Sequence, residues 1–193
     1  MWFVPLSSSL TELAERIVEH YEGRRTPPFQ VYQYEPSEEY EVRKELKELR
    51  QWLEASPRNI ECETISLAHL FWQALEANQM LETVIQEEQS GRHQDAEKAV
   101  RQILGIEPTL ADRLVGEIEQ CANERSAIFL YRAGALYPAF RTNTLLEQLK
   151  AQVDRPVTLL YPGKSVGEGL SFMGKADPTY GYRAIVVHRG AQQ

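Results

Sequence analysis

The amino-acid sequence predicts a three-layer α/β domain built on a mostly parallel central sheet of about five strands. Two segments of the last third, residues 126–134 and 155–164, follow one plan: a short apolar run whose end carries an aromatic residue, a basic residue and a glycine. Apolar runs of this length are typical of strands buried on both faces. The helical stretch between them indicates a crossover connection between parallel strands, whose carboxyl ends are where ligands usually bind.

The first part of the chain alternates helices with strands. Residues 10–22 repeat apolar side chains at helical spacing behind a capping box of Ser9 and Glu12, so we expect the first helix there. Residues 29–34 then read as a strand. The order of elements that follows is typical of βαβ units.

A long second helix is expected behind a turn at Pro36–Ser37, which supplies its cap, and a second strand spans residues 59–65. Another helix begins near Leu67. From about residue 79 to 124 the pattern is helical throughout, with a break at Ser90–Arg92. We interpret this stretch as a helical insertion between two strands of the sheet.

The sheet resumes after the insertion with the two segments of the last third, and residues 181–188 supply a final strand. The helix between those segments begins either at Pro138, which suits a first helical turn, or at a capping box of Thr144 and Glu147. Since no internal repeat and no low-complexity linker divides the chain, we expect a single domain over residues 1–193.

Length and composition indicate a globular protein with a full hydrophobic core, since the 193 residues are 42% hydrophobic and 25% charged. The apolar start, Met1–Leu6, is too short for a membrane span and lacks the basic region of a signal peptide, so we expect a cytoplasmic protein without membrane contact. The two cysteines, Cys62 and Cys121, are expected to be reduced core residues.

The formal net charge of −7 conceals an asymmetry along the chain. Residues 1–124 hold 12 basic and 24 acidic side chains, whereas residues 125–193 hold 9 basic and 4 acidic ones. One interpretation is that the acidic portion consists of ordinary solvated helix faces. The other is that the basic portion meets an acidic protein surface or a phosphate, because a local field can recruit an anion against the net charge.

The sequence offers no established catalytic or metal motif. Gly163-Lys164-Ser165 follows a strand, but Thr158 stands where a phosphate-binding loop needs its first glycine, and residues 166–169 are a poor helix start, so we expect a plain turn. The four histidines lack metal-ligand spacing, and no serine lies in a GxSxG elbow. We therefore expect no metal, no cofactor and no catalytic residue.

The segment 132–141, which follows a buried strand, is the candidate site. One interpretation is a connection whose aromatic residues pack on the core while its arginines are solvated. The other is recognition of a carboxylate, a phosphate or a partner surface near the carboxyl edge of the sheet, for which arginine and tyrosine side chains are suited. The candidate partner- or anion-binding residues are Arg132, Gly134, Tyr137, Arg141, Tyr161, Lys164 and Arg183.

Several segments of the chain, taken in their order and spacing, resemble one known family. They are FQVYQYEP at 29–36, GALYPAFR at 134–141 followed by LLEQL at 145–149, PVTLLYPG at 156–163, and YGYRA at 180–184. Over about residues 29–187 the chain resembles the BrxB family of bacteriophage-exclusion (BREX) defence systems. Arg132 departs from the small or hydroxyl residue expected beneath the glycine, and Gly181 interrupts the expected aromatic run.

The resemblance implies an accessory component of defence loci that also encode a large ATPase, an adenine-specific DNA methyltransferase and a phosphatase-like protein. It supplies no catalytic residues, so we expect a non-enzymatic scaffold or adaptor that acts by protein–protein interaction with these proteins. The alternative is a degenerate NTPase-like enzyme or a nucleotide- or phosphate-sensing module that uses the loops at the carboxyl edge of the sheet. Direct nucleic-acid binding is disfavoured, because the acidic total opposes the phosphate attraction on which such binding depends.

Overall fold

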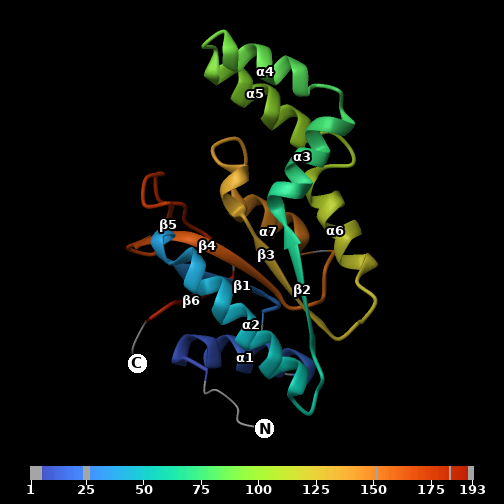
Figure 1. Cartoon of the computed structure of the whole chain (residues 1–193), viewed down its shortest axis with the longest axis vertical. Helices are drawn as coiled ribbons and strands as arrows, with labels where there is room; N and C mark the ends of the chain where they lie inside the picture. Colours follow the sequence, from blue (N-terminus) through green and yellow to red (C-terminus); the bar gives the residue numbers. More distant parts are fainter. Residues whose placement is uncertain (1–5, 24–26, 151, 183, 191–193) are drawn as a thin grey trace. The chain divides into compact units, whose positions relative to one another are not determined.

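The computed structural model describes residues 6–23, 27–150, 152–182 and 184–190. It confirms an α/β fold with a mostly parallel central sheet flanked by helices (Figure 1). The chain forms two compact units. We call Met1–Ile65, Cys121–Tyr131 and Asp154–Gln193 the sheet unit, and Ser66–Gln120 with Arg132–Val153 the helical unit. Whether both units fold as the single domain expected from the sequence stays a prediction.

Within the described residues, six strands form the sheet in the order β2-β3-β4-β1-β6, with β5 paired to β4. β4 lies parallel to both β3 and β1, β1 lies parallel to β6, and β5 runs antiparallel to β4. The strands are β1 Phe29–Tyr34, β2 Glu61–Ser66, β3 Ser126–Tyr131, β4 Val157–Val166, β5 Gly169–Phe172 and β6 Ile185–His188.

β1 spans residues 29–34 as predicted, and β3 lies within the segment 126–134 that predicts it, but the strands near the C-terminus require corrections. The predicted turn at Gly163-Lys164-Ser165 is wrong, because these residues continue β4 and pair with β5. β5 itself has no counterpart among the predicted strands. β6 begins at Ile185 rather than at Gly181, whose φ of +78° is not that of an extended strand.

Two helices, α1 Ser8–Tyr21 and α2 Glu39–Ala55, cover one face of the sheet in the sheet unit, and the short helix η1 Pro36–Glu38 precedes α2 (Figure 1). The predicted capping box at Ser9 is wrong. The Oγ of Ser7 instead accepts a hydrogen bond from the backbone N–H of Leu10 at 3.4 Å, and Ser9 lies inside the helix on its buried face.

The core of the sheet unit lies between these helices and the sheet. It includes Leu13, Ile17, Leu49 and Leu53 from the helices and Tyr32, Phe129, Leu160 and Val187 from the strands. Side chains of the opposite face of the sheet, such as Val31, Leu130 and Leu159, are fully buried as well. The prediction that the central strands are buried on both faces is therefore confirmed.

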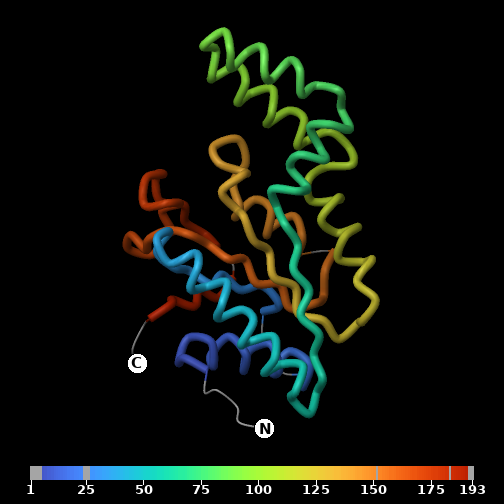
Figure 2. Tube along the Cα trace, viewed as in Figure 1, coloured from blue at the N-terminus to red at the C-terminus, as the bar shows by residue number. Residues whose placement is uncertain are grey.

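The helical unit contains α3 Leu67–Ala77, α4 Leu81–Gln89, α5 His93–Leu104, α6 Leu110–Gln120, η2 Ala133–Leu136 and α7 Thr142–Leu149. α3 contacts α5, α6 and η2, while α4 packs on α5 and α6 on α7. The break predicted at Ser90–Arg92 is confirmed, because Gly91 adopts φ +73° where the trace reverses between α4 and α5 (Figure 2). α7 begins at Thr142, so neither predicted start, at Pro138 or at Thr144, is correct.

Candidate functional site

Gln33, near the end of β1, connects three strands at the carboxyl edge of the sheet unit. It is buried, and its Nε2 donates to the carbonyl of Gly163 on β4. Its Oε1 lies 2.7 Å from Nδ1 of His188 on β6. Because an amide oxygen only accepts hydrogen bonds, Nδ1 of His188 carries the hydrogen that joins them. The side chain thus fixes the ends of β1, β4 and β6 relative to one another.

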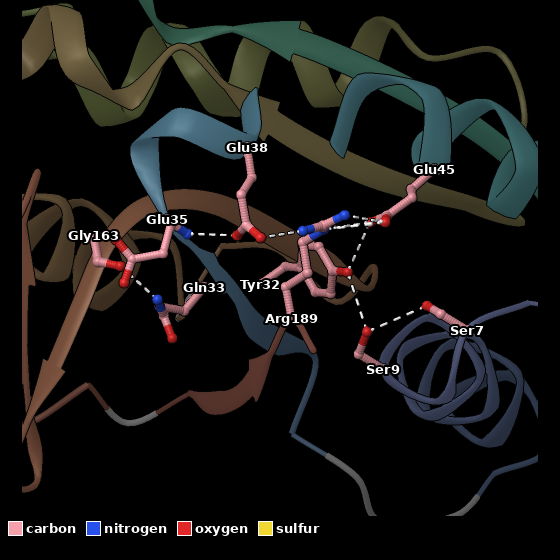
Figure 3. Close-up of polar contacts among 9 residues, drawn as sticks. All are labelled: Ser7, Ser9, Tyr32, Gln33, Glu35, Glu38, Glu45, Gly163 and Arg189. Carbon is pink, nitrogen blue, oxygen red and sulfur yellow. Dashed lines mark hydrogen bonds and ion pairs between the residues drawn. The ribbon is translucent and has the colours of Figure 1, made fainter. Parts of the chain in front are cut away.

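Arg189, directly after β6, lies at the centre of a second polar cluster (Figure 3). Its Nε and Nη2 donate to the Glu45 carboxylate on α2 at 2.8–3.1 Å, and its Nη1 pairs with Glu38 of η1. The Tyr32 hydroxyl donates to the same Glu45 carboxylate at 3.1 Å and lies 3.3 Å from Oγ of Ser9. The cluster therefore ties the C-terminal strand to α1, β1 and α2.

The electrostatics of this edge favour a structural role. Burial raises the pKa of the Tyr32 phenol above its ordinary value, and the nearby Glu45 charge adds to that shift, so the hydroxyl stays protonated and donates. Arg189 already has two carboxylate partners, and Nζ of Lys164 lies 3.5 Å from the Glu35 carboxylate. The cations placed here are therefore at least partly neutralised before any ligand arrives.

The predicted site residues of the sheet unit differ in their exposure to solvent. Tyr161 is buried, its hydroxyl donates to the carbonyl of Leu170 at 3.3 Å, and its ring meets Phe172 edge-on at 5.3 Å between centroids. Lys164 is exposed on β4. Arg183 lies outside the described residues. Tyr161 thus packs in the interior, which leaves Lys164 as the accessible member of this group.

The other predicted site residues lie together in the helical unit, in the segment Arg132–Arg141, which we call the β3–α7 connection. Arg132 is exposed and adopts the left-handed backbone conformation, with φ +58° and ψ +39°. Gly134 is exposed within η2, Tyr137 is 52% exposed, and Arg141 is exposed at the N-cap of α7. Four predicted residues therefore share one short stretch of surface.

Buried side chains and a hydrogen bond from α5 hold the backbone of the β3–α7 connection in place. Ala133, Leu136 and Ala139 are buried, and Nε of Arg101 on α5 donates to the carbonyl of Ala139 at 3.3 Å. Exposed side chains on an anchored backbone lose less conformational entropy when a partner binds. That these residues join Tyr161 and Lys164 in one site stays a prediction.

Sequence reasoning missed the residues that organise the carboxyl edge: Gln33, Glu45, His188 and Arg189. Among these residues Gln33 alone carried a signal, because it is one of two amide side chains in a strand whose other residues are apolar or aromatic, and buried amides generally need hydrogen-bond partners. Among the described residues there is no group of three or more side chains that could hold a metal ion. No helix of the described chain is long and apolar enough to cross a membrane.

Comparison with known protein families decides where the chain belongs. The model of the family described as BREX protein BrxB matches residues 63–187, from within β2 to within β6. The chain belongs to the BrxB family. Searches of curated proteins and of solved structures found no match.

Membership of the BrxB family makes the chain a component of a BREX phage-defence system. The matched residues include the whole β3–α7 connection and the β4–β5 hairpin. They begin after β1, so the resemblance of residues 29–36 lies outside the match.

Proposed function

We propose that this BrxB-family protein is a non-enzymatic scaffold or adaptor of a BREX defence complex in the cytoplasm. It acts by protein–protein interaction with the other proteins of its locus, which are a phosphatase-like protein, an ATPase and a DNA methyltransferase. The observation that carries the proposal is the β3–α7 connection, where Tyr137 and Arg141 are exposed on an anchored backbone. Tyrosine and arginine are among the residues that most often dominate interface energy.

The backbone of Arg132 supports the same proposal. A residue other than glycine in the left-handed region costs about 1–2 kcal/mol, and the φ of Arg132 is +58°. Such strain persists where the surrounding structure enforces it, and it concentrates at functional sites. An exposed arginine held in this conformation at the start of the connection fits a surface that recognises a partner.

The carboxyl edge of the sheet unit supports a non-enzymatic role. A phosphate-binding loop needs backbone N–H groups that curl around the anion, whereas residues Gly163–Val166 pair with β5 as an extended strand. The cations there already have carboxylate partners. Neither feature suits the alternative function, a nucleotide-processing or phosphate-sensing module.

Co-purification tests the adaptor role. The tagged chain is co-expressed with the three other proteins of its locus, as the parent and as Tyr137→Ala and Arg141→Ala. Both variants are expected to keep the circular-dichroism spectrum of the parent, to retain less partner and to lose phage protection. Tyr40→Ala is the matched control, because Tyr40 is 65% exposed on α2 of the sheet unit. Folded Tyr137 and Arg141 variants that keep their partners and still protect cells would refute the docking role.

Calorimetry tests the alternative function. Titration of the purified protein with ATP and magnesium is expected to show no binding, because no amide cradle is present at Gly163–Val166. Micromolar binding that disappears in Lys164→Ala would overturn this expectation and favour a nucleotide sensor.

A further inference from the structure

Trp72 on α3 is a large apolar side chain that the helical unit leaves uncovered. It is 50% exposed, although Leu67, Leu70, Ala74 and Leu75 of the same helix are buried. Its ring meets Phe71 edge-on, with 5.5 Å between centroids, a contact that orients the indole without burying it. The indole N–H makes no hydrogen bond with any residue that the structure describes.

The helix that carries Trp72 packs against the β3–α7 connection. α3 contacts η2, which lies near the start of the connection. It also contacts α5, whose Arg101 donates a hydrogen bond to the carbonyl of Ala139 in the connection. Trp72 and Tyr137 therefore belong to elements that pack on one another within the helical unit. Both of these aromatic side chains are about half exposed.

The charges of the β3–α7 connection indicate the charge of the group that binds to it. Residues 132–141 include two arginines and no acidic residue. The guanidinium of Arg141 makes no hydrogen bond or ion pair with any residue in the described part of the chain. Arginine forks pair best with carboxylates or phosphates, so the complementary group is an anion.

We propose that Trp72 and the β3–α7 connection form one docking surface, and that its occupant is a partner protein with an apolar pocket bordered by carboxylates. The inference rests on the proposed function. It adds Trp72 as the central residue of the docking surface and states the chemistry of the partner. Trp72 fills the pocket, since tryptophan is enriched among the side chains that dominate interfaces. Arg132 and Arg141 meet the carboxylates at the border.

A nucleic acid fits this surface less well than a protein does. Binding of nucleic acid depends on several cations that follow the phosphate backbone. α3 and α4, however, contain no lysine or arginine, and they carry Glu76, Glu82, Glu87 and Glu88. A protein partner, in contrast, needs carboxylates only opposite the two arginines. The acidic side chains of α3 and α4 then repel any protein whose acidic residues would lie opposite these helices.

Affinity measurements test the inference. The three other proteins of the locus are purified and the affinity of each for the full chain is measured by biolayer interferometry. For the protein that binds, Trp72→Ala is expected to weaken affinity at least about tenfold, as expected for a dominant interface residue. Tyr180→Ala is the matched control, because Tyr180 is 60% exposed in the sheet unit, and it is expected to bind like the parent. Added salt is expected to weaken binding of the parent more than binding of Arg141→Ala.

The outcomes separate this inference from the proposed function. If Tyr137→Ala and Arg141→Ala lose the partner while a folded Trp72→Ala keeps it, the enlarged surface is wrong and the adaptor role stands. If all three variants bind as the parent does, neither Trp72 nor the β3–α7 connection forms the docking surface, and the partner binds elsewhere on the chain. A gel-shift with duplex DNA or a concentration-dependent dimer that Trp72→Ala abolishes would overturn the assignment of a partner protein.

Discussion

Arg189 and Glu45 are 144 residues apart in the sequence, yet three hydrogen bonds of 2.8–3.1 Å join the guanidinium to the carboxylate. Each side chain is only 19% exposed, so water screens the pair weakly. Tyr32 donates to the same carboxylate. The pair attaches the end of β6, an edge strand of the sheet, to α2.

Loss of the Arg189 side chain is expected to destabilise the sheet unit. Arg189→Ala leaves two carboxylates, Glu38 and Glu45, without their shared cation. Both are only partly buried, so the cost should lie toward the lower end of the about 1–3 kcal/mol for a buried group that loses its partner. Urea denaturation measures the free energy of unfolding. Arg50→Ala is the control, because its pair with Glu54 is exposed and such pairs contribute about 0–1 kcal/mol. Equal effects of the two substitutions would contradict a structural role for Arg189.

Two glycine substitutions are expected to change stability in opposite directions. A Cβ at Gly163 would lie 2.4 Å from the carbonyl oxygen of Ser171 and 2.6 Å from Cε1 of Tyr161. Gly163→Ala should therefore destabilise the protein by about 1–3 kcal/mol, as overpacking does. A Cβ at Gly116, inside α6, meets nothing within 4 Å, so Gly116→Ala should stabilise by about 0.5–1 kcal/mol. Thermal unfolding of both variants checks the signs, and a Gly163→Ala variant as stable as the parent would disprove the close approach of β4 and β5.

The hydroxyl of Thr158 is expected to contribute nothing to stability. It is buried between strands, and its Oγ1 has no hydrogen-bond partner among the described residues. Thr158→Val removes an unsatisfied polar group and should leave the free energy of unfolding unchanged or raise it by up to about 1 kcal/mol.

Ser126→Ala is the matched control for Thr158→Val. Ser126 is equally buried, but its Oγ accepts a hydrogen bond from Nη1 of Arg155 at 3.2 Å, so its loss should destabilise by about 1 kcal/mol. Guanidinium denaturation compares the two variants. A Thr158→Val variant less stable than Ser126→Ala would contradict the expectation that the threonine hydroxyl has no stabilising partner.

The two cysteines are expected to differ in reactivity. Burial, with a smaller contribution from Glu54, raises the pKa of the Cys62 thiol from 9.0 to about 12, whereas Cys121 is half-buried at the end of α6. Iodoacetamide reacts with thiolates, so at pH 8 it should label Cys121 in the folded protein and Cys62 only after unfolding. Peptide mass spectrometry of labelled samples identifies the site, and labelling of Cys62 at the rate of Cys121 would contradict its burial.

The same pKa shift predicts how stability depends on pH. Because the pKa of Cys62 is higher in the folded than in the unfolded chain, its contribution to stability is complete below pH 9 and is lost as the pH rises toward 12. Cys62→Ala should therefore show a shallower loss of stability than the parent across that range. Parallel slopes for the two proteins would refute the shift.

Local patterns were sufficient where a strand or turn depends on neighbouring residues. The bounds of β1 and β3 follow from short runs of mostly apolar and aromatic residues, because strands buried on both faces are rich in such residues. The break between α4 and α5 follows from Gly91, which adopts a left-handed conformation that other residues resist. The resemblance to the BrxB family likewise required only the order and spacing of short segments.

Local patterns failed where the conformation of a residue depends on a contact with a residue distant in the sequence. Three consecutive serines, Ser7, Ser8 and Ser9, are equivalent as caps in the sequence. Ser9 lies within the first turn of α1 on its buried face, where its Oγ is 3.3 Å from the Tyr32 hydroxyl. The residues Gly163-Lys164-Ser165 read as a turn because they follow an apolar run and match neither a phosphate-binding loop nor a helix start. They are strand because β5 returns to pair with them.

The sequence by itself determined the α/β class, the bounds of β1 and β3 and the residue types of the β3–α7 connection, since these depend on local periodicity and chemistry. Only the tertiary structure decided which polar groups meet. Gln33 contacts His188, 155 residues later in the sequence, because the strand order places β1 beside β6. Arg189 contacts Glu45, 144 residues earlier, because α2 packs on the sheet near the end of β6. No local pattern encodes such pairs, since their geometry exists only after the sheet has assembled.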